Sequence, residues 1–497
     1  MMTTMEQLDD DLCYRALKTR DRRFDGRFYT AVLTTGIFCR PICPAATPKR
    51  TNVKFYPTVE AAMTHGFRPC LRCRPEAAPK SPASLGVRAT VARAVRLIEQ
   101  GALETGSVLD LAARLGMGDR HLRRLFRQQT GVTIRQHARA RRLLRARQLI
   151  AESSLPMTGI ADAAGFASLR RFNDAMKQAY GHAPTVFRRG MLPIDKTGRN
   201  NMPCAARDDD LILRLNAHPP FDAQYLQGFF RARAVPGLEF AGDGVYARGF
   251  CSKGATGLVI CRFMQDRPGV EVILRGPGRK ASLEIGERVR NLFDLDTNIS
   301  TINAQLADDI LLRPMVSARP GLRMPGCWER FELAVRAVLG QRISLAAART
   351  LAGRLVARYG AVLSRSLTED LGVTHLFPTP DRLVGENLTS IGLTRRQAQT
   401  VADMAELFAG LAEGKADGQN MLDMVARIKG IGPWTLNYFA LRGLSDPDAF
   451  PATDLGIAKA LAIIGGPDTS KALEKHAQRW RPWRAYAAQY LWSVLGG

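Results

Sequence analysis

The chain has 497 residues and a formal net charge of +25, and 46% of its residues are hydrophobic. A chain of this length exceeds one compact core, so about three or four domains are expected. The positive charge, combined with an ordinary hydrophobic content, excludes a disordered basic tail and favours a folded protein with a polyanionic partner. Nucleic acid is the commonest such partner, and an acidic membrane surface is the alternative.

No uninterrupted apolar run approaches the ~20 residues that a membrane span requires. The opening MMTTMEQLDDDLCYR carries acidic residues where a secretion signal has an apolar segment. We therefore expect a cytoplasmic protein without a membrane partner. In that reducing compartment the nine cysteines should not form disulfides, and their odd number agrees with this expectation.

Residues 1–80 contain four clustered cysteines. Cys39 and Cys43 lie in GIFCRPICP, and Cys70 and Cys73 lie in RPCLRC. Four thiolates with CxxxC and CxxC spacing match a tetrahedral zinc site. The zinc would either only stabilise a small domain or also hold a reactive thiolate. Basic residues around the cluster would favour contact with a DNA phosphate; they are Arg40, Lys49, Arg50, Arg68, Arg72 and Arg74.

The next region, 86–190, has the pattern of short helices with glycine turns and many arginines. VLDLAARLGMGDRHLRRLFRQQTG and MTGIADAAGFASLRRFNDAMKQAYG share one order, an apolar helix, a glycine-containing turn and a basic helix. Both segments predict helix-turn-helix units, whose second helix enters the DNA major groove. The expected DNA contacts are Arg123, Arg124, Arg170 and Arg171, although such arginines also occur on ordinary solvated helix faces.

The second half of the chain changes character twice. Residues 208–315 contain short strands bounded by glycine, such as GVYARGF and GVEVILRG, and an amphipathic helix, ASLEIGERVRNLFDL. Residues 316–497 are predominantly helical in pattern. The predicted fold class is therefore multidomain: a small α+β four-cysteine zinc domain, an all-α double helix-turn-helix domain, an α+β domain and an all-α domain.

The helical region contains the string MLDMVARIKGIGPWTLNYFALRG. A helix ends at Gly430, and Pro433 opens the next helix at its favoured first position. Gly430 and Gly432 let a backbone approach a phosphate, and free N–H groups at a helix start favour an anion. The string predicts a helix-hairpin-helix that binds the DNA backbone, although such turns also occur without a ligand. Asp454, in FPATDLGIAKAL, precedes another helix, where a simple N-cap role would also explain it.

Three families resemble parts of this chain. DGRFYTAVLTTGIFCRPICP and FYPTVEAAMTHGFRPCLRC resemble the N-terminal domain of the Ada methylation-response proteins. GFASLRRFNDAMKQAYGHAPTVFRR resembles the AraC-family DNA-binding domain. PGLRMPGCWERFELAVRAVLGQRIS, GIGPWTLNYFALRG, ATD and RWRPWRAYAAQYLW resemble the AlkA branch of the helix-hairpin-helix DNA glycosylases.

The Ada resemblance implies that Cys39 is both a zinc ligand and the acceptor of a methyl group from a methylphosphotriester in damaged DNA. Cys43, Cys70 and Cys73 are then the other ligands. The AraC resemblance implies sequence-specific binding of promoter DNA, with RNA polymerase as a further partner.

The AlkA resemblance implies that Asp454 is the catalytic residue for hydrolysis of the N-glycosidic bond of alkylated bases such as 3-methyladenine. It places Trp434, Tyr438 and Trp483 in an aromatic base pocket, with Phe229 from the α+β domain as a fourth member. Electron-rich rings would attract a cationic base. Trp434 occupies the position of the Schiff-base lysine of bifunctional relatives, so hydrolysis without strand cleavage is expected.

The same resemblance implies a monovalent cation at the helix-hairpin-helix. It also places Arg342, in GQRIS, where relatives have an apolar wedge that fills the gap left by a flipped base.

The first hypothesis is therefore a protein that senses methylated DNA, activates repair genes and excises alkylated bases. The second is a transcription regulator whose glycosylase-like half only binds DNA, and the third is a glycosylase whose N-terminal half only targets it to DNA. Asp454 together with the aromatic set argues against the second hypothesis, and the intact FCRP motif argues against the third.

Overall fold

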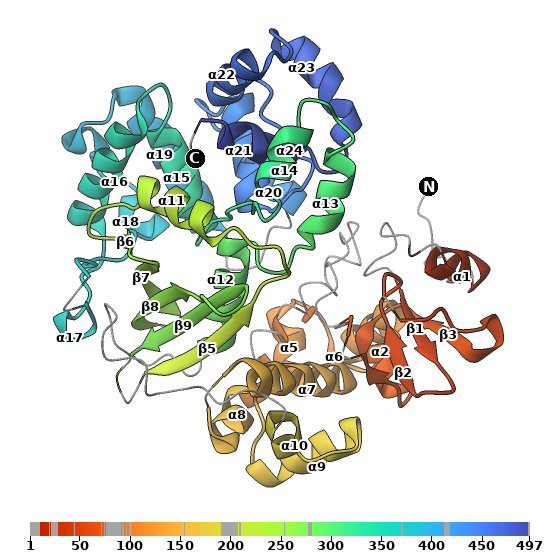
Figure 1. The fold of residues 1–497 in the computed structure, drawn as a ribbon. Helices are drawn as coiled ribbons and strands as arrows, with labels where there is room; N and C mark the ends of the chain where they lie inside the picture. Colours follow the sequence, from red (N-terminus) through yellow and green to blue (C-terminus); the bar gives the residue numbers. More distant parts are fainter. Residues whose placement is uncertain are drawn as a thin grey trace. The chain divides into compact units, whose positions relative to one another are not determined.

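The computed structural model describes residues 10–18, 20, 28–43, 45–70, 72–73, 75, 91, 94–95, 97–98, 102–153, 155–189, 207, 210–252, 254–276, 281–368, 371–411 and 418–495. The chain divides into two compact units, Met1–Pro193 and Ile194–Gly497. Figure 1 shows both, and each is described by itself. No helix in the described ranges has both the length and the apolar character that a membrane crossing requires.

The four-cysteine segment of the first unit folds around a sheet with strand order β3-β1-β2-β4. Strand β2 (Ile37–Cys39) pairs antiparallel with β1 (Tyr29–Val32) and parallel with β4 (Arg68–Pro69), and β1 also pairs with β3 (Val53–Tyr56). Strand β2 ends at Cys39, and Cys70 directly follows β4. The parallel pairing of two strands far apart in sequence therefore brings the two cysteine pairs together. Helices α1 (Asp10–Lys18) and α2 (Val59–Thr64) complete this part.

The next helices contain the repeat that the sequence predicts. A helix of 7 residues, a turn and a helix of 12 residues occur twice. The four helices are α5 (Val108–Arg114), α6 (Asp119–Thr130), α8 (Met157–Ala163) and α9 (Leu169–Tyr180). The first and second turns contain Gly116 and Gly165, both with a left-handed φ that favours glycine. The all-α double helix-turn-helix prediction is confirmed.

The 19-residue helix α7 (Ile134–Glu152) joins the two helix pairs, and α4 (Ala102–Thr105) and α10 (Pro184–Arg189) flank them. Helix α2 of the four-cysteine segment packs on α7, where Val59 and Ala62 share an apolar cluster with Leu144. The hydroxyl of Thr58 also donates to the carbonyl oxygen of Thr130 at the end of α6, at 3.3 Å. The cysteine domain and the first helix-turn-helix unit are thus packed as one body.

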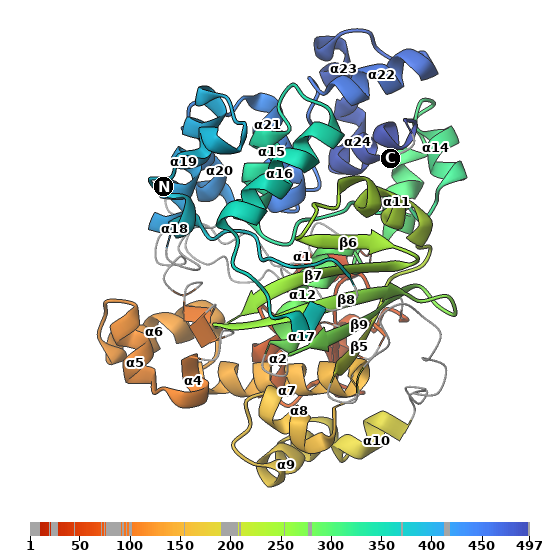
Figure 2. The ribbon, with the colours of Figure 1, turned by 90° about the vertical axis from the view of Figure 1, so that its left-hand side faces the viewer.

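The second unit begins with an antiparallel sheet of order β5-β9-β8-β7-β6. The strands are β5 (Leu211–Asn216), β6 (Glu239–Gly242), β7 (Val245–Ser252), β8 (Ala255–Phe263) and β9 (Gly269–Arg275). Both faces are buried. One face packs against Leu363, Leu371 and Val373. The other meets α11 (Ala223–Arg233) and α12 (Ser282–Phe293), and Figures 1 and 2 both show α12 against the sheet.

The remaining described elements of this unit are mostly helical, which confirms the α+β-then-all-α prediction. They are α13 (Ile299–Leu306), α14 (Arg313–Ala318), α15 (Arg330–Leu339), α16 (Leu345–Tyr359), α17 (Arg365–Thr368), α18 (Pro380–Leu383), α19 (Arg395–Gly410), α20 (Gly418–Ala426), α21 (Pro433–Gly443), α22 (Leu455–Ile464), α23 (Ser470–His476) and α24 (Arg484–Ser493). They form two apolar cores, one around α15 and α19 and one around α22 and α24.

Candidate metal centre and active site

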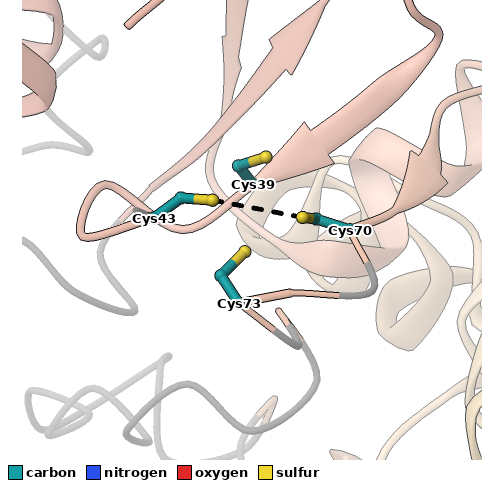
Figure 3. A group of neighbouring side chains, drawn as sticks. All are labelled: Cys39, Cys43, Cys70 and Cys73. Carbon is teal, nitrogen blue, oxygen red and sulfur yellow. Dashed lines mark hydrogen bonds between the residues drawn. The ribbon is translucent and has the colours of Figure 1, made fainter. Parts of the chain in front are cut away.

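Figure 3 shows the side chains of Cys39, Cys43, Cys70 and Cys73 gathered in one place. Their sulfur atoms all lie within 4.8 Å of one another, and the Sγ atoms of Cys43 and Cys70 are 4.0 Å apart. Zn–S bonds of about 2.3 Å in a tetrahedron separate neighbouring sulfurs by about 3.8 Å. The spacing and the donor set both fit a zinc ion.

The electrostatics of the cluster also favour a cation. Hydrogen bonds with Cys43 and Cys73, together with burial, raise the pKa of Cys39, and the hydrogen bond with Cys39 is the main cause that lowers the pKa of Cys43 to about 2. Thiolates this close together repel one another. A zinc ion would offset this repulsion and allow all four sulfurs to be thiolates. The four cysteines are a zinc site.

The basic residues around the cysteines differ in availability. Arg50 pairs with Asp10 at 3.2 Å and with Asp11 at 3.4 Å, so it is already engaged by α1. The backbone N–H of Arg40 donates to the Sγ of Cys73 at 3.4 Å, which holds this part of the cluster. The side chains of Lys49, Arg68 and Arg72 are exposed, and Arg74 lies outside the described residues.

The predicted DNA contacts of the helix-turn-helix units are exposed. Arg123 and Arg124 lie on α6, and Arg170 and Arg171 lie at the start of α9. The Nε–H of Arg123 donates to Asp119 at 2.7 Å, one turn earlier on the same helix. Helix α6 buries Leu122 and Phe126, and α9 buries Phe172, so each of the two helices has one face in the core and one in solvent.

Asp454 caps the N-terminus of α22, where its Oδ1 accepts the N–H of Ile457 at 2.9 Å. The same carboxylate accepts two indole N–H groups, from Trp434 at 2.5 Å and from Trp492 at 2.8 Å. An N-cap requires only the first of these contacts. The two indoles therefore hold the carboxylate in one orientation beyond what the helix end needs.

Asp454 lines a cavity of about 610 Å³ between the sheet domain and the helices of the second unit. Trp434, Tyr438 and Phe229 line it as well. The rings of Trp434 and Tyr438 are stacked, with centroids 5.2 Å apart and planes at 14°. Trp492 meets Tyr438 edge to face, at 6.5 Å. A concave aromatic site with a few polar groups is typical of a ligand pocket.

Trp483 is not among the residues that line this cavity. It precedes α24 and packs edge to face against Tyr486, with centroids 6.2 Å apart. The second indole that donates to Asp454, besides that of Trp434, belongs to Trp492 at the other end of α24. Trp483 and Trp492 both occur in RWRPWRAYAAQYLW. The direction in which α24 runs decides which of the two faces the carboxylate of Asp454.

The two hairpin glycines differ in their surroundings. Gly430 has a φ of +96°, and a Cβ on it would lie 2.3 Å from the Oγ1 of Thr400. Around Gly432, which precedes α21, a Cβ would meet nothing within 4 Å. Gly430 is therefore required by the fold of the turn, whereas Gly432 leaves open space in front of a helix N-terminus.

The hairpin is tied to the turn between α15 and α16. The side-chain amide of Gln341 donates to the carbonyl oxygen of Gly430 at 3.1 Å and to the hydroxyl of Thr435 at 3.0 Å. The next residue, Arg342, is exposed and has a left-handed φ of +60°, which residues other than glycine rarely adopt. Such backbone strain is often found at functional sites.

A four-thiolate zinc centre, a paired helix-turn-helix domain and an aromatic cavity with a fixed carboxylate beside a helix-hairpin-helix define a DNA-binding repair protein with a regulatory half. Double-stranded DNA is the partner that these domains share.

The comparisons with known families agree with this class. Residues 12–76 match the family described as "Metal binding domain of Ada", and 111–190 match "Helix-turn-helix domain". Residues 212–329 match "AlkA N-terminal domain", and 335–484 match "HhH-GPD superfamily base excision DNA repair protein".

The "Probable bifunctional transcriptional activator/DNA repair enzyme AlkA" of Mycobacterium tuberculosis is 40% identical over 98% of this chain and 97% of its own length. The "DNA-3-methyladenine glycosylase 2" of Escherichia coli is 32% identical over 57% of this chain and 97% of its own length. The Escherichia coli "Bifunctional transcriptional activator/DNA repair enzyme Ada" is 38% identical over 37% of this chain and 50% of its own length. The chain belongs to the family of bifunctional Ada/AlkA transcriptional activator and DNA repair proteins.

Proposed function

We propose that Asp454 is the catalytic carboxylate of a glycosylase that removes alkylated bases such as 3-methyladenine from DNA. The observation that carries this proposal is the carboxylate held by two indoles and a helix N-terminus at the wall of an aromatic cavity. A transcription regulator whose glycosylase-like half only binds DNA would not need this arrangement.

The chemistry follows from the position of that carboxylate. When the C1′–N bond breaks, its electron pair leaves with the base, and positive charge develops on the sugar. The Asp454 carboxylate stabilises that charge, and water then adds to C1′ and loses a proton. Trp434 occupies the place of the lysine that forms a Schiff base in bifunctional relatives, so the DNA strand stays intact.

The hairpin and the neighbouring turn position the DNA for this step. Gly432 and the N-terminus of α21 would receive a backbone phosphate. The hairpin would also hold a monovalent cation. Arg342 would occupy the gap that the flipped base leaves in the duplex. Its exposure and its unusual backbone conformation at the hairpin support this role.

In the first unit, Cys39 would accept the methyl group of a methylphosphotriester. Its sulfur attacks the methyl carbon, an S–C bond forms, and the C–O bond electrons pass to the phosphate oxygen. Zinc supplies the chemistry that keeps the sulfur a thiolate at neutral pH. With zinc held by four thiolates the centre would carry a charge of about −2, and methylation of Cys39 would reduce it to about −1, which would weaken repulsion of ordinary DNA.

That change would promote binding of promoter DNA by the helix-turn-helix units. Arg123, Arg124, Arg170 and Arg171 would contact the DNA, and RNA polymerase would be recruited as a further partner. Unpaired thiols persist in a reducing compartment, so a four-thiol metal site supports a cytoplasmic location.

The glycosylase proposal is tested by base release from methylated DNA. Asp454→Asn should lose release of 3-methyladenine, whereas Asp468→Asn, an exposed aspartate in the loop before α23, should release it at the original rate. Equal release by Asp454→Asn and the unmodified protein would show that another group does the chemistry. No release by the unmodified protein would favour the regulator that only binds DNA.

The methyl-transfer proposal needs a separate measurement. After incubation with DNA that contains methylphosphotriesters, mass spectrometry should find one added methyl group on Cys39 and none on the exposed Cys251. An unmodified Cys39 would leave the centre a structural zinc site.

A further inference from the structure

The cavity beside Asp454 contains more positive than negative side chains. Its acidic lining residues are Asp454, Glu239 and Glu332, and its basic lining residues are Arg233, Arg248, Arg336, Arg349, Arg442 and Lys459. The charge of a base that enters this cavity therefore matters to its binding.

Two of the arginines are neutralised by the two glutamates. Arg248 pairs with Glu332 at 2.6 Å and with Glu239 at 3.4 Å. Arg336 pairs with Glu332 at 2.9 Å and with Glu239 at 3.0 Å. In this network two anions balance two cations, and Glu239 also accepts hydrogen bonds from the hydroxyl of Tyr246 and the backbone N–H of Val235.

Arg233 and Arg442 form no ion pair with a carboxylate in the part of the chain that the structure describes. The buried Arg442 donates to the carbonyl oxygen of Pro325 at 2.6 Å and to the side chain of Gln489 at 3.1 Å. Among the described residues, the half-buried Arg233 side chain donates only to the carbonyl oxygen of Phe229, at 3.3 Å. A guanidinium has five N–H donors, so Arg233 retains several for a ligand in the cavity.

These two arginines also contact the aromatic rings of the pocket. The guanidinium carbons of Arg233 and Arg442 lie 3.9 Å and 4.7 Å from the ring centroid of Phe229. Arg442 lies 5.2 Å from Tyr438 and 5.4 Å from Trp492. The attraction of these rings for a cation is therefore already used by side chains of the protein.

Burial is the main cause that lowers the pKa of the Arg233 guanidinium, because a charged group loses solvation there. Arg442 and Arg336 lower this pKa as well, whereas Tyr438 and Tyr225 raise it. A cation placed beside Arg233 would meet the positive charges of Arg233 itself and of Arg442.

We propose that Arg233 is a specificity-determining residue that shifts the glycosylase towards uncharged damaged bases bearing a carbonyl oxygen, relative to cationic ones. The inference rests on the proposed function of the cavity as the base pocket. An uncharged base leaves with the electron pair of the C1′–N bond and becomes an anion, which a hydrogen bond from Arg233 stabilises. A cationic base leaves neutral, gains nothing from this donor and is repelled by it on entry.

The test is a competition between two duplexes in one reaction, one containing 7-methylguanine, which is cationic, and one containing hypoxanthine, which is uncharged. Their ratio of kcat/KM does not depend on how much of the enzyme is active. In Arg233→Met the ratio of uncharged to cationic base release should fall about tenfold or more, as expected for loss of one charged hydrogen-bond donor. Arg233→Lys should retain part of the preference. The control is Arg231→Met, which removes an exposed arginine from the same helix and should leave the ratio unchanged.

An unchanged ratio in Arg233→Met, or an equal fall in Arg231→Met, would overturn the proposal. If Arg233→Met does not fold, Arg233→Gln carries the same test, because it also removes the charge. Asp454→Asn, measured with both duplexes, distinguishes a failure of the proposed function from a failure of the role of Arg233. If Asp454→Asn abolishes release of both bases but Arg233→Met leaves their release ratio unchanged, only the role of Arg233 fails. If Asp454→Asn abolishes release of neither base, the proposed function fails.

Discussion

Replacing Gly430 with alanine should destabilise the second unit, because this position is left-handed and closely packed. The new Cβ would lie 2.3 Å from the Oγ1 of Thr400, which donates to the carbonyl oxygens of Arg396 at 3.0 Å and Lys429 at 2.9 Å. The left-handed backbone costs a non-glycine residue about 1–2 kcal/mol. Moving the threonine hydroxyl away from its acceptors costs about 1 kcal/mol more. We therefore expect a loss of about 2–3 kcal/mol in the free energy of unfolding.

Tryptophan fluorescence during urea denaturation of the intact protein measures this loss selectively. All five tryptophans of the chain lie after residue 194, so the signal reports on the second unit alone. The matched control is Gly432→Ala, which meets no atom within 4 Å and should change stability by no more than about 0.5 kcal/mol. In the double variant Gly430→Ala with Thr400→Ala, the two effects should not add, since the contact between them is gone.

If Gly430→Ala loses no more stability than Gly432→Ala, neither the left-handed backbone nor the contact with Thr400 makes residue 430 depend on glycine. The control variant Gly432→Ala also tests the binding of DNA. Because the space in front of Gly432 is proposed to receive a DNA phosphate, Gly432→Ala should weaken DNA binding in a gel-shift titration while the unfolding midpoint stays the same.

Three further predictions concern the other sites. Trp492→Phe removes the N–H group that donates to Asp454 at 2.8 Å, so base release should slow by about tenfold. Trp483→Phe should leave the rate unchanged. Slower release by Trp483→Phe and not by Trp492→Phe would show that Trp483 is the pocket residue. A strong chelator should remove zinc and make four further thiols reactive towards a colorimetric thiol reagent; an unchanged thiol count would mean that no metal was held there. Arg124→Gln should reduce the slope of log binding constant against log salt for promoter DNA by about 1 if Arg124 contacts a phosphate; an identical slope would place it away from the backbone.

Local pattern was sufficient for much of the fold. The cysteine spacing indicated the zinc site, and the sulfur atoms of Cys39, Cys43, Cys70 and Cys73 do converge. The repeated order of apolar helix, glycine turn and basic helix predicted two units, and both have helices of 7 and 12 residues. The helix-turn-helix repeat and each CxxxC or CxxC pair depend on residues close together in the chain, whereas the parallel pairing of β2 with β4 joins the two cysteine pairs. The roles of Cys39 as methyl acceptor and Asp454 as catalyst stay predictions that the proposed experiments test.

The order of domains, the two cysteine pairs and the aspartate at a helix start can thus be read from the sequence, because short-range spacing and helix-capping rules govern them. The convergence of the two cysteine pairs needs the parallel pairing of β2 with β4. Tertiary structure alone decided that Trp492 reaches Asp454 and Trp483 does not, since both lie in one aromatic string and differ only in which way α24 runs. It also decided which arginines are neutralised. Nothing in the sequence distinguishes Arg248 from Arg233. In the structure, the sheet and α15 bring carboxylates to Arg248, whereas Arg233 lines the cavity with no carboxylate partner among the described residues.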